Sequence, residues 1–102
     1  MYLTEQEIAK IKDFFRTKPV RKAYLFGSYA RGEANAESDV DLLVDLDLDG
    51  FKDGVLEFFI WHEDLAELLG KNVDVIAPNK HPSRFKSRIE PDLTLLYEQQ
   101  AA

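Results

Sequence analysis

Residues 24–49, with the sequence YLFGSYARGEANAESDVDLLVDLDLD, constrain the fold of this chain more than any other stretch. A short apolar run stops at the pair Gly27 and Ser28, a polar stretch follows, and a second apolar run then begins. Short apolar runs bounded by turn residues are typical of buried strands. We therefore expect a strand over residues 22–26, a glycine turn into a short helix, a loop, and a second strand over residues 40–46.

Two carboxylates stand at the mouth of the second expected strand. Residues two apart on a strand point to the same face, so Asp39 and Asp41 aim together, while Val40 and Leu42 point into a core. Adjacent carboxylates repel each other and stay ionised when a positive charge sits between them. A hard divalent cation with oxygen ligands, most naturally Mg²⁺, suits that place.

The turn before the short helix is a candidate phosphate site. We expect Ser28 to cap the short helix and Gly32 to end it. Backbone N–H groups at the turn after Gly27, together with a helix N-terminus, attract phosphate. Metal-binding carboxylates that face a phosphate site are the parts required for phosphoryl or nucleotidyl transfer.

The combined motif resembles that of the DNA polymerase beta-like nucleotidyltransferases. The residues that carry the resemblance are Gly27 and Ser28, followed after ten residues by Asp39-Val40-Asp41. The fuller text GSYARGEA with SDVDL is similar to the smallest members of that superfamily, the minimal nucleotidyltransferases of prokaryotes. The resemblance covers nearly the whole chain and implies an α+β fold, a small mixed β-sheet with helices packed on it.

This resemblance also implies roles for individual residues. The reaction would be Mg²⁺-dependent transfer of a nucleoside monophosphate from a nucleoside triphosphate, such as ATP, to a hydroxyl group. Asp39 and Asp41 would hold two Mg²⁺ ions, and Gly27 and Ser28 would bind the β- and γ-phosphates. Asp74, in the apolar segment VDVI of a third expected strand over residues 72–76, would supply the family's third carboxylate. An acid between β-branched residues is costly without a partner, although Asp74 could also be a cap or a surface acid.

Two other side chains carry open alternatives. Arg31 is a candidate phosphate contact, or else the partner of Glu33 or Glu37 in a surface ion pair. His62, on an apolar helical stripe, is more often a satisfied helix histidine than a ligand. The basic residues of an expected helix over residues 83–89 are more often a solvated face than a nucleotide clamp.

The acceptor follows from the resemblance alone. Minimal nucleotidyltransferases are commonly paired with a helical HEPN-type toxin, a ribonuclease, and act as antitoxins that move AMP from ATP onto a toxin tyrosine. One alternative is nucleotidylation of a small molecule such as an antibiotic, although relatives with that activity usually carry an additional helical domain. Another is a non-catalytic antitoxin that acts by occupancy.

Composition limits the partners. A chain of 102 residues makes one domain, residues 1–102, and its net charge of −6 gives no general attraction for nucleic acid, so we expect no direct nucleic-acid binding. The chain has no cysteine, which fits a reducing cytoplasm. No apolar run reaches transmembrane length and the N-terminus does not resemble a signal peptide, so we expect a cytoplasmic protein without membrane contact.

The remaining elements are two helices and an edge strand. Thr4 and Glu7 form a capping box that opens a helix ending near Arg16. The fourth strand, over residues 93–97, is expected at an edge of the sheet.

A long helix is expected over residues 51–69, closed by Gly70. Its core stripe would consist of Phe51, Val55, Phe58, His62, Leu65 and Leu69. Leu56 and Ile60 fall on the opposite side and Trp61 and Leu68 to one side, so the outer face is a candidate interface with a partner or a second copy.

Overall fold

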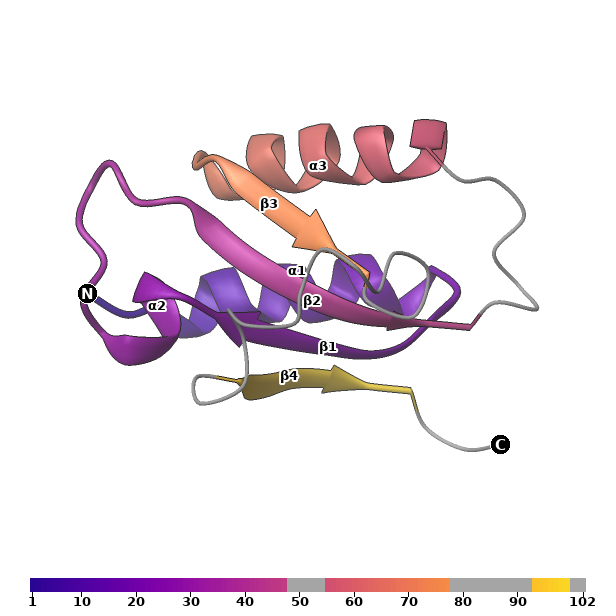
Figure 1. Cartoon of the computed structure of the whole chain (residues 1–102), viewed down its shortest axis with the longest axis horizontal. Helices are drawn as coiled ribbons and strands as arrows, with labels where there is room; N and C mark the ends of the chain where they lie inside the picture. Colours follow the sequence, from indigo (N-terminus) through magenta and orange to yellow (C-terminus); the bar gives the residue numbers. More distant parts are fainter. Residues whose placement is uncertain (48–54, 78–92, 100–102) are drawn as a thin grey trace.

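The computed structural model describes residues 1–47, 55–77 and 93–99 of the chain. It confirms the expected α+β architecture, in which helices and strands alternate from α1 to β3 and β4 is the last described element (Figure 1). The elements are α1 (Glu5–Arg16), β1 (Val20–Phe26), α2 (Ser28–Arg31), β2 (Val40–Leu46), α3 (Val55–Leu69), β3 (Val73–Ile76) and β4 (Thr94–Glu98).

The four strands form one mixed sheet in the order β3-β2-β1-β4. β1 pairs antiparallel with β2 on one side and with β4 on the other, whereas β2 and β3 run parallel. The described strand β4 lies at an edge, as expected from the sequence. Because β1 runs opposite to β2 and β3, the end of β1 and the starts of β2 and β3 meet at the same end of the sheet, beside α2 (Figure 1).

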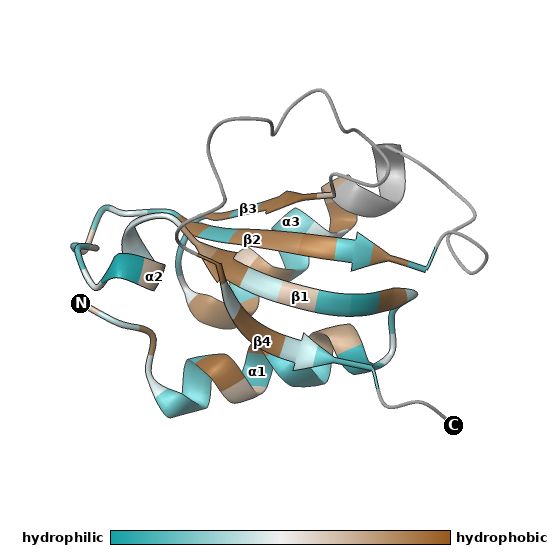
Figure 2. Ribbon diagram, turned by 60° about the horizontal axis from the view of Figure 1, so that its bottom comes forward, coloured by the Kyte–Doolittle hydropathy of each residue, from teal (hydrophilic) through white to brown (hydrophobic). Residues whose placement is uncertain are grey.

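Helices α1 and α3 contact each other and pack on one face of the sheet, and Figure 2 shows α1 lying along that face. β2 illustrates why the sheet has two unlike faces. Its alternate residues Val40, Leu42, Val44 and Leu46 are almost completely buried and belong to the core cluster shared with both helices. Each such side chain contributes about 1.5–3 kcal/mol of transfer free energy, so this strand anchors the core.

The predicted capping box of α1 is confirmed. The backbone N–H of Glu7 donates to the Thr4 hydroxyl oxygen at 3.0 Å, and the backbone N–H of Thr4 donates to Glu7 Oε1 at 2.9 Å. The helix then buries Ile11 and Phe15 at a spacing of one turn, and Arg16 is its last residue. Local sequence signals therefore place both ends of this helix.

The prediction of which side of α3 faces the core is partly wrong. Leu65 and Leu69 are buried as expected, but Trp61, which the stripe placed to one side, is 2% exposed and is among the most buried side chains. The reason is the neighbouring helix. Phe14 and Phe15 of α1 lie edge-on to the indole, with ring centroids 6.3 and 6.2 Å away, and thereby extend the core toward α1.

The outer face of α3 does expose apolar side chains. Phe59, Ile60 and Leu68 are 59%, 45% and 44% exposed. Glu63, Asp64 and Glu67 are exposed on the same helix. In the described chain no helix is both long and apolar enough to cross a membrane.

Two smaller expectations also change. β1 begins at Val20 rather than at residue 22, because Val20 is fully buried and pairs with Leu46 across a bulge. The N-cap of α2 is Gly27 rather than Ser28, and no side chain caps this helix. Gly32 ends α2 with a positive φ of 76°, as predicted.

Several predicted features lie outside the described residues. They are the first residues of the long helix, the side chains of Phe51, Val55, Leu56 and Phe58, and the basic helix over residues 83–89.

Candidate functional site

Gly27 connects β1 to α2 in a backbone conformation that only glycine adopts readily. Its φ and ψ are 74° and −153°, a region essentially closed to residues with a Cβ atom. A Cβ atom at this position would also collide with Oδ2 of Asp41 on the neighbouring strand. Glycine is therefore required twice, by the turn itself and by the close approach of the Asp41 carboxylate.

The sheet register brings two of the predicted carboxylates together. Asp41 pairs with Phe26 of β1 on one side and with Asp74 of β3 on the other. Laterally paired residues point to the same face, and here that face is the one opposite α1 and α3. Asp41 and Asp74 are both half-buried. The third strand therefore presents its acid on the same face as Asp41, as the sequence analysis requires.

Asp39 lies just before β2 and is exposed. The loop that leads to it is a tight polar turn, in which the Asn35 N–H donates to the Ser38 hydroxyl at 2.9 Å and the Glu37 N–H donates to Asn35 Oδ1 at 2.8 Å. Since strand residues two apart share a face, we expect Asp39 to lie on the same face of the sheet as Asp41. A local hydrogen-bonded turn thus fixes the chain where it enters the site.

The donor set fits a hard cation. Three carboxylates supply the oxygen ligands that Mg²⁺ prefers, and the missing side chain at Gly27 leaves room beside the Asp41 oxygen. Across the described part of the chain, however, no three His, Cys, Asp or Glu side chains already lie close enough together to hold a metal ion. The metal-binding roles of Asp39, Asp41 and Asp74 therefore stay predictions.

Of the two alternatives predicted for Arg31, the structure shows the surface ion pair with Glu33. The Nε of Arg31 donates to Glu33 Oε1 at 3.0 Å in a solvent-exposed ion pair. Both residues follow the turn at Gly27, so the guanidinium lies on the element next to the expected phosphate site. Gly27 and Ser28 are half-buried at that turn. Phosphate binding by these three residues stays a prediction.

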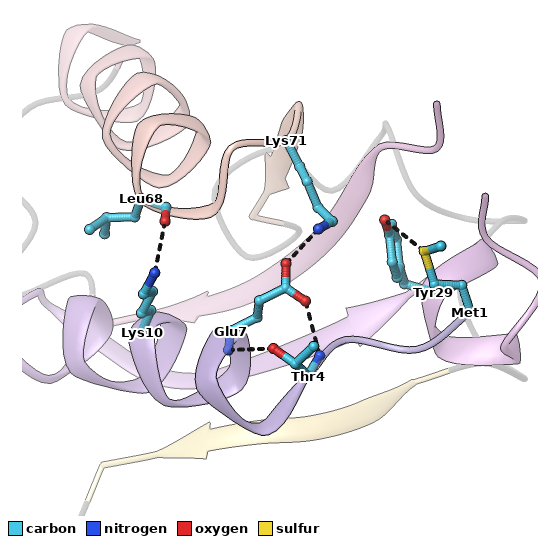
Figure 3. Close-up of polar contacts among 7 residues, drawn as sticks. All are labelled: Met1, Thr4, Glu7, Lys10, Tyr29, Leu68 and Lys71. Carbon is cyan, nitrogen blue, oxygen red and sulfur yellow. Dashed lines mark hydrogen bonds and ion pairs between the residues drawn. The ribbon is translucent and has the colours of Figure 1, made fainter. Parts of the chain in front are cut away.

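An ion pair behind the site joins α1 to the turn before β3. Lys71 Nζ donates to Glu7 Oε2 at 2.6 Å, while the other oxygen of the same carboxylate completes the capping box with Thr4 (Figure 3). Lys10 Nζ makes a second, longer contact at 3.4 Å to the carbonyl oxygen of Leu68. Next to Lys71, the carbonyl oxygen of Asn72 accepts the Val40 N–H at 2.8 Å. The starts of β2 and β3 are thus tied to each other and to α1.

The ion pair shifts the pKa of both partners. Burial of Glu7 opposes its ionisation, but hydrogen bonds from Lys71 and Thr4 outweigh this, so the pKa of Glu7 lies below its ordinary value. The hydrogen bond to Glu7 raises the pKa of Lys71. Sequence reasoning missed this pair because 64 residues separate its members and no local pattern links them.

His62 is a hydrogen-bonded helix histidine, which is the alternative that the sequence favoured over a ligand. Its ring nitrogens lie 3.1 Å from the carbonyl oxygen of Val73 and 3.2 Å from that of Val75, both on β3. The predicted core stripe indicated that this residue faces inward. It gave no sign that the ring would meet the backbone of the strand that carries Asp74.

The chain matches the family model described as "Polymerase beta, Nucleotidyltransferase" over residues 9–102. Among curated proteins, it is 41% identical over 81 residues to the protein adenylyltransferase MntA of Thermococcus cleftensis, covering 72% of this chain and 77% of that one. The family match begins within α1 and includes every later described element through β4.

Solved structures with the same fold include a toxin–antitoxin complex with AMP-PNP, at a TM-score of 0.74 and 22% identity, covering 96% of this chain and 76% of that chain. Another is the tri-AMPylated Shewanella oneidensis HEPN toxin in complex with its MNT antitoxin, at a TM-score of 0.70 and 18% identity. That match covers 96% of this chain and 75% of the other. At these identities the likeness concerns the fold.

Proposed function

Because this chain belongs to the polymerase beta nucleotidyltransferase family, we propose that it is a protein adenylyltransferase that acts as an antitoxin. The reaction transfers AMP from ATP to a tyrosine hydroxyl of a HEPN-type ribonuclease toxin. The observation that carries the proposal is the position of Asp41, which lies between the glycine turn at Gly27 and its register partner Asp74.

In the proposed site the chain holds its substrates from two sides. The turn at Gly27 and Ser28 binds the β- and γ-phosphates of ATP, with Arg31 beside it. Asp39, Asp41 and Asp74 hold two Mg²⁺ ions. When bound, Mg²⁺ neutralises triphosphate charge and so favours attack at the α-phosphorus and departure of pyrophosphate.

Asp74 has the second role of accepting a proton. A tyrosine hydroxyl has a pKa near 10 and is a weak nucleophile at neutral pH, so it needs a base as attack proceeds. The proton passes to the Asp74 carboxylate while the tyrosine oxygen bonds to the α-phosphorus. The bond from that phosphorus to the bridging oxygen breaks, and the products are AMP-tyrosine and pyrophosphate.

Three observations support a protein as the acceptor. A curated relative that is 41% identical over 81 residues is named a protein adenylyltransferase. Structures of the same fold include an MNT antitoxin in complex with an AMPylated HEPN toxin. The net charge of −6 disfavours nucleic acid and suits a basic ribonuclease.

The outer face of α3 is the proposed contact with the toxin. Phe59 and Ile60 expose apolar surface on one side of α3 and Leu68 on another, and Glu63, Asp64 and Glu67 make the same helix acidic. Exposed apolar clusters rimmed by charge commonly mark protein interfaces. An oligomer of this chain through the same helix is the competing use of the surface, and light scattering of the isolated chain distinguishes the two.

The test is to incubate the protein with ATP, Mg²⁺ and a HEPN-type toxin, and to map adducts by mass spectrometry. We expect AMP on a toxin tyrosine, and none with Asp41→Asn or with EDTA. Loss of ribonuclease activity without any adduct would establish inhibition by occupancy instead. AMP on a small molecule such as an antibiotic would retain the nucleotidyltransferase chemistry and replace the acceptor.

A further inference from the structure

β3 is a short strand with one described neighbour, and it carries Asp74. Among the described strands it lies at an edge of the sheet and pairs with β2 alone, over residues 73–76. In a parallel ladder alternate residues direct their backbone groups to the neighbouring strand, and the residues between them direct theirs outward. The carbonyl of Asn72 accepts from Val40 of β2, so Asn72 and Asp74 face β2, while Val73 and Val75 face outward.

His62 of α3 meets those outward groups. Nδ1 lies 3.1 Å from the Val73 carbonyl oxygen, and Nε2 lies 3.2 Å from the Val75 carbonyl oxygen and 3.4 Å from the Val75 nitrogen. With the proton on Nδ1, the ring donates to Val73 and accepts the N–H of Val75. One rigid ring therefore binds the strand backbone on both sides of Asp74.

We propose that His62 is a positioning residue, whose imidazole holds β3 at the register in which Asp74 lies next to Asp41. This inference rests on the proposed role of Asp74 as the third carboxylate. His62 touches neither metal nor nucleotide in this proposal. It acts through the backbone of β3.

The physical need for such a residue comes from the strand itself. Edge strands present unpaired N–H and C=O groups to solvent, and a four-residue ladder to one neighbour resists fraying weakly. A slip by a single residue would turn every side chain of β3 to the opposite face. Asp74 would then point toward the helices, away from Asp41, and Val73 or Val75 would take its place on the outer face.

The ring can prevent that slip because α3 fixes its position and both of its nitrogens contact the β3 backbone. α3 is packed on β3, and His62 lies between the buried residues Trp61 and Leu65 of its own helix. Its two contacts on β3 are two residues apart, so a slipped strand would present them out of phase with the ring. Lys71, bound to Glu7, fixes only the turn before the strand.

The experiment compares His62→Ala, His62→Gln and Ala66→Gly with the unmodified chain. Glutamine restores a donor and an acceptor on one side chain, so it is the rescue variant. Ala66 lies one turn further along α3, and glycine there weakens the helix while the His62 ring stays in place, so it controls for a general loss of stability. Each protein is titrated with Mn²⁺ in the presence of a non-hydrolysable ATP analogue, and amide exchange is followed by NMR.

We expect His62→Ala to weaken Mn²⁺ binding by about tenfold, as is common when a residue that orients a metal ligand is lost. Most of that loss should return in His62→Gln, and Ala66→Gly should bind as the unmodified chain does. The diagnostic amide is Val40, which donates to Asn72 across the β2–β3 ladder. Its exchange should accelerate in His62→Ala more than in Ala66→Gly, because the strand has lost its register.

Unchanged Mn²⁺ affinity in His62→Ala, or an equal loss in Ala66→Gly, would overturn the proposal and leave His62 a purely structural residue. The proposed function fails separately, if the unmodified chain binds no Mn²⁺ with the ATP analogue. In that case exchange at Val40 still decides whether His62 holds the strand.

Discussion

The Lys71 ammonium nitrogen lies 2.6 Å from Glu7 Oε2 and joins the first turn of α1 to the turn that leads into β3. The two side chains are only 27% and 15% exposed, so solvent screens them less than a surface pair. The same carboxylate accepts the Thr4 N–H, which makes Glu7 both a helix cap and an anchor between distant segments.

Glu7→Gln separates those two roles, because glutamine still completes a capping box but carries no charge. We expect the free energy of unfolding to fall by about 1 kcal/mol at pH 7. The folded pKa of Glu7 is lowered, so its contribution is present above the ordinary value of 4.5 and is lost as pH falls through the folded value. Urea unfolding of both proteins at a series of pH values measures this difference.

The matched control is Asp13→Asn. Asp13 pairs with Arg16 at the surface of the same helix, where both side chains are mostly exposed. That change should have little effect at any pH. A Glu7→Gln deficit that persisted unchanged well below pH 4.5 would show that the lost stability does not come from the ion pair.

Gly27→Ala should abolish the site while leaving a folded protein. The substituted residue must hold a φ of 74° and must displace Asp41 Oδ2, so we expect a stability loss of about 1–3 kcal/mol. Because displacement of a reacting group by 1 Å can cost about 100-fold, AMP transfer should fall by at least that factor. Gly70→Ala is the control, since Gly70 also has a positive φ but open space around it. Equal activities of the two variants would contradict this account.

Asp41→Asn should fold normally and lose AMP transfer. It removes one negative charge from beside Asp74, so the metal-free protein should be no less stable, with a Tm change below about 4 °C. Loss of a metal-binding carboxylate should reduce transfer by about 100-fold or more. Asp45→Asn, four residues along the same strand and also half-buried, should remain active. A large drop in Tm for Asp41→Asn, measured by calorimetry, would assign the residue a structural role instead.

Trp61→Ala tests the side of α3 that faces the core. The indole is buried against Phe14 and Phe15, so its removal should cost about 3–5 kcal/mol. Ile60→Ala, one residue earlier and 45% exposed, should change stability by less than about 0.5 kcal/mol. Chemical denaturation of the two variants checks the contrast, and similar losses would mean that the helix is rotated relative to the one described.

Local patterns predicted the parts of this fold that depend on neighbours in sequence. The capping box needs only Thr4 and Glu7, and the bounds of β2 follow from its apolar run and the two acids around Val40. Gly32 and Gly70 end their helices with the positive φ that glycine permits. The placement of Asp74 on the same face as Asp41 follows from strand alternation once the third strand is recognised.

Features set by distant segments could not be predicted in this way. The periodicity of α3 indicates an amphipathic helix, but the rings of α1 that bury Trp61 decide which side is inward. No pattern within α3 shows that His62 reaches the edge of β3. Gly27 was predicted as a turn, yet its second constraint, the nearby Asp41 carboxylate, appears only when two strands are paired.

The position of β4 has a consequence for folding during translation. β1 has an edge that only β4 covers among the described strands, and more than 60 residues separate the two strands in sequence. Translation at common rates needs roughly 3 to 13 seconds to cross that interval. During this time the nascent protein carries an open strand edge on β1, opposite the edge that pairs with β2. A neighbouring chain that has already released residues 94–98 can fill it, so strand exchange is the misassembly to which this topology is most exposed.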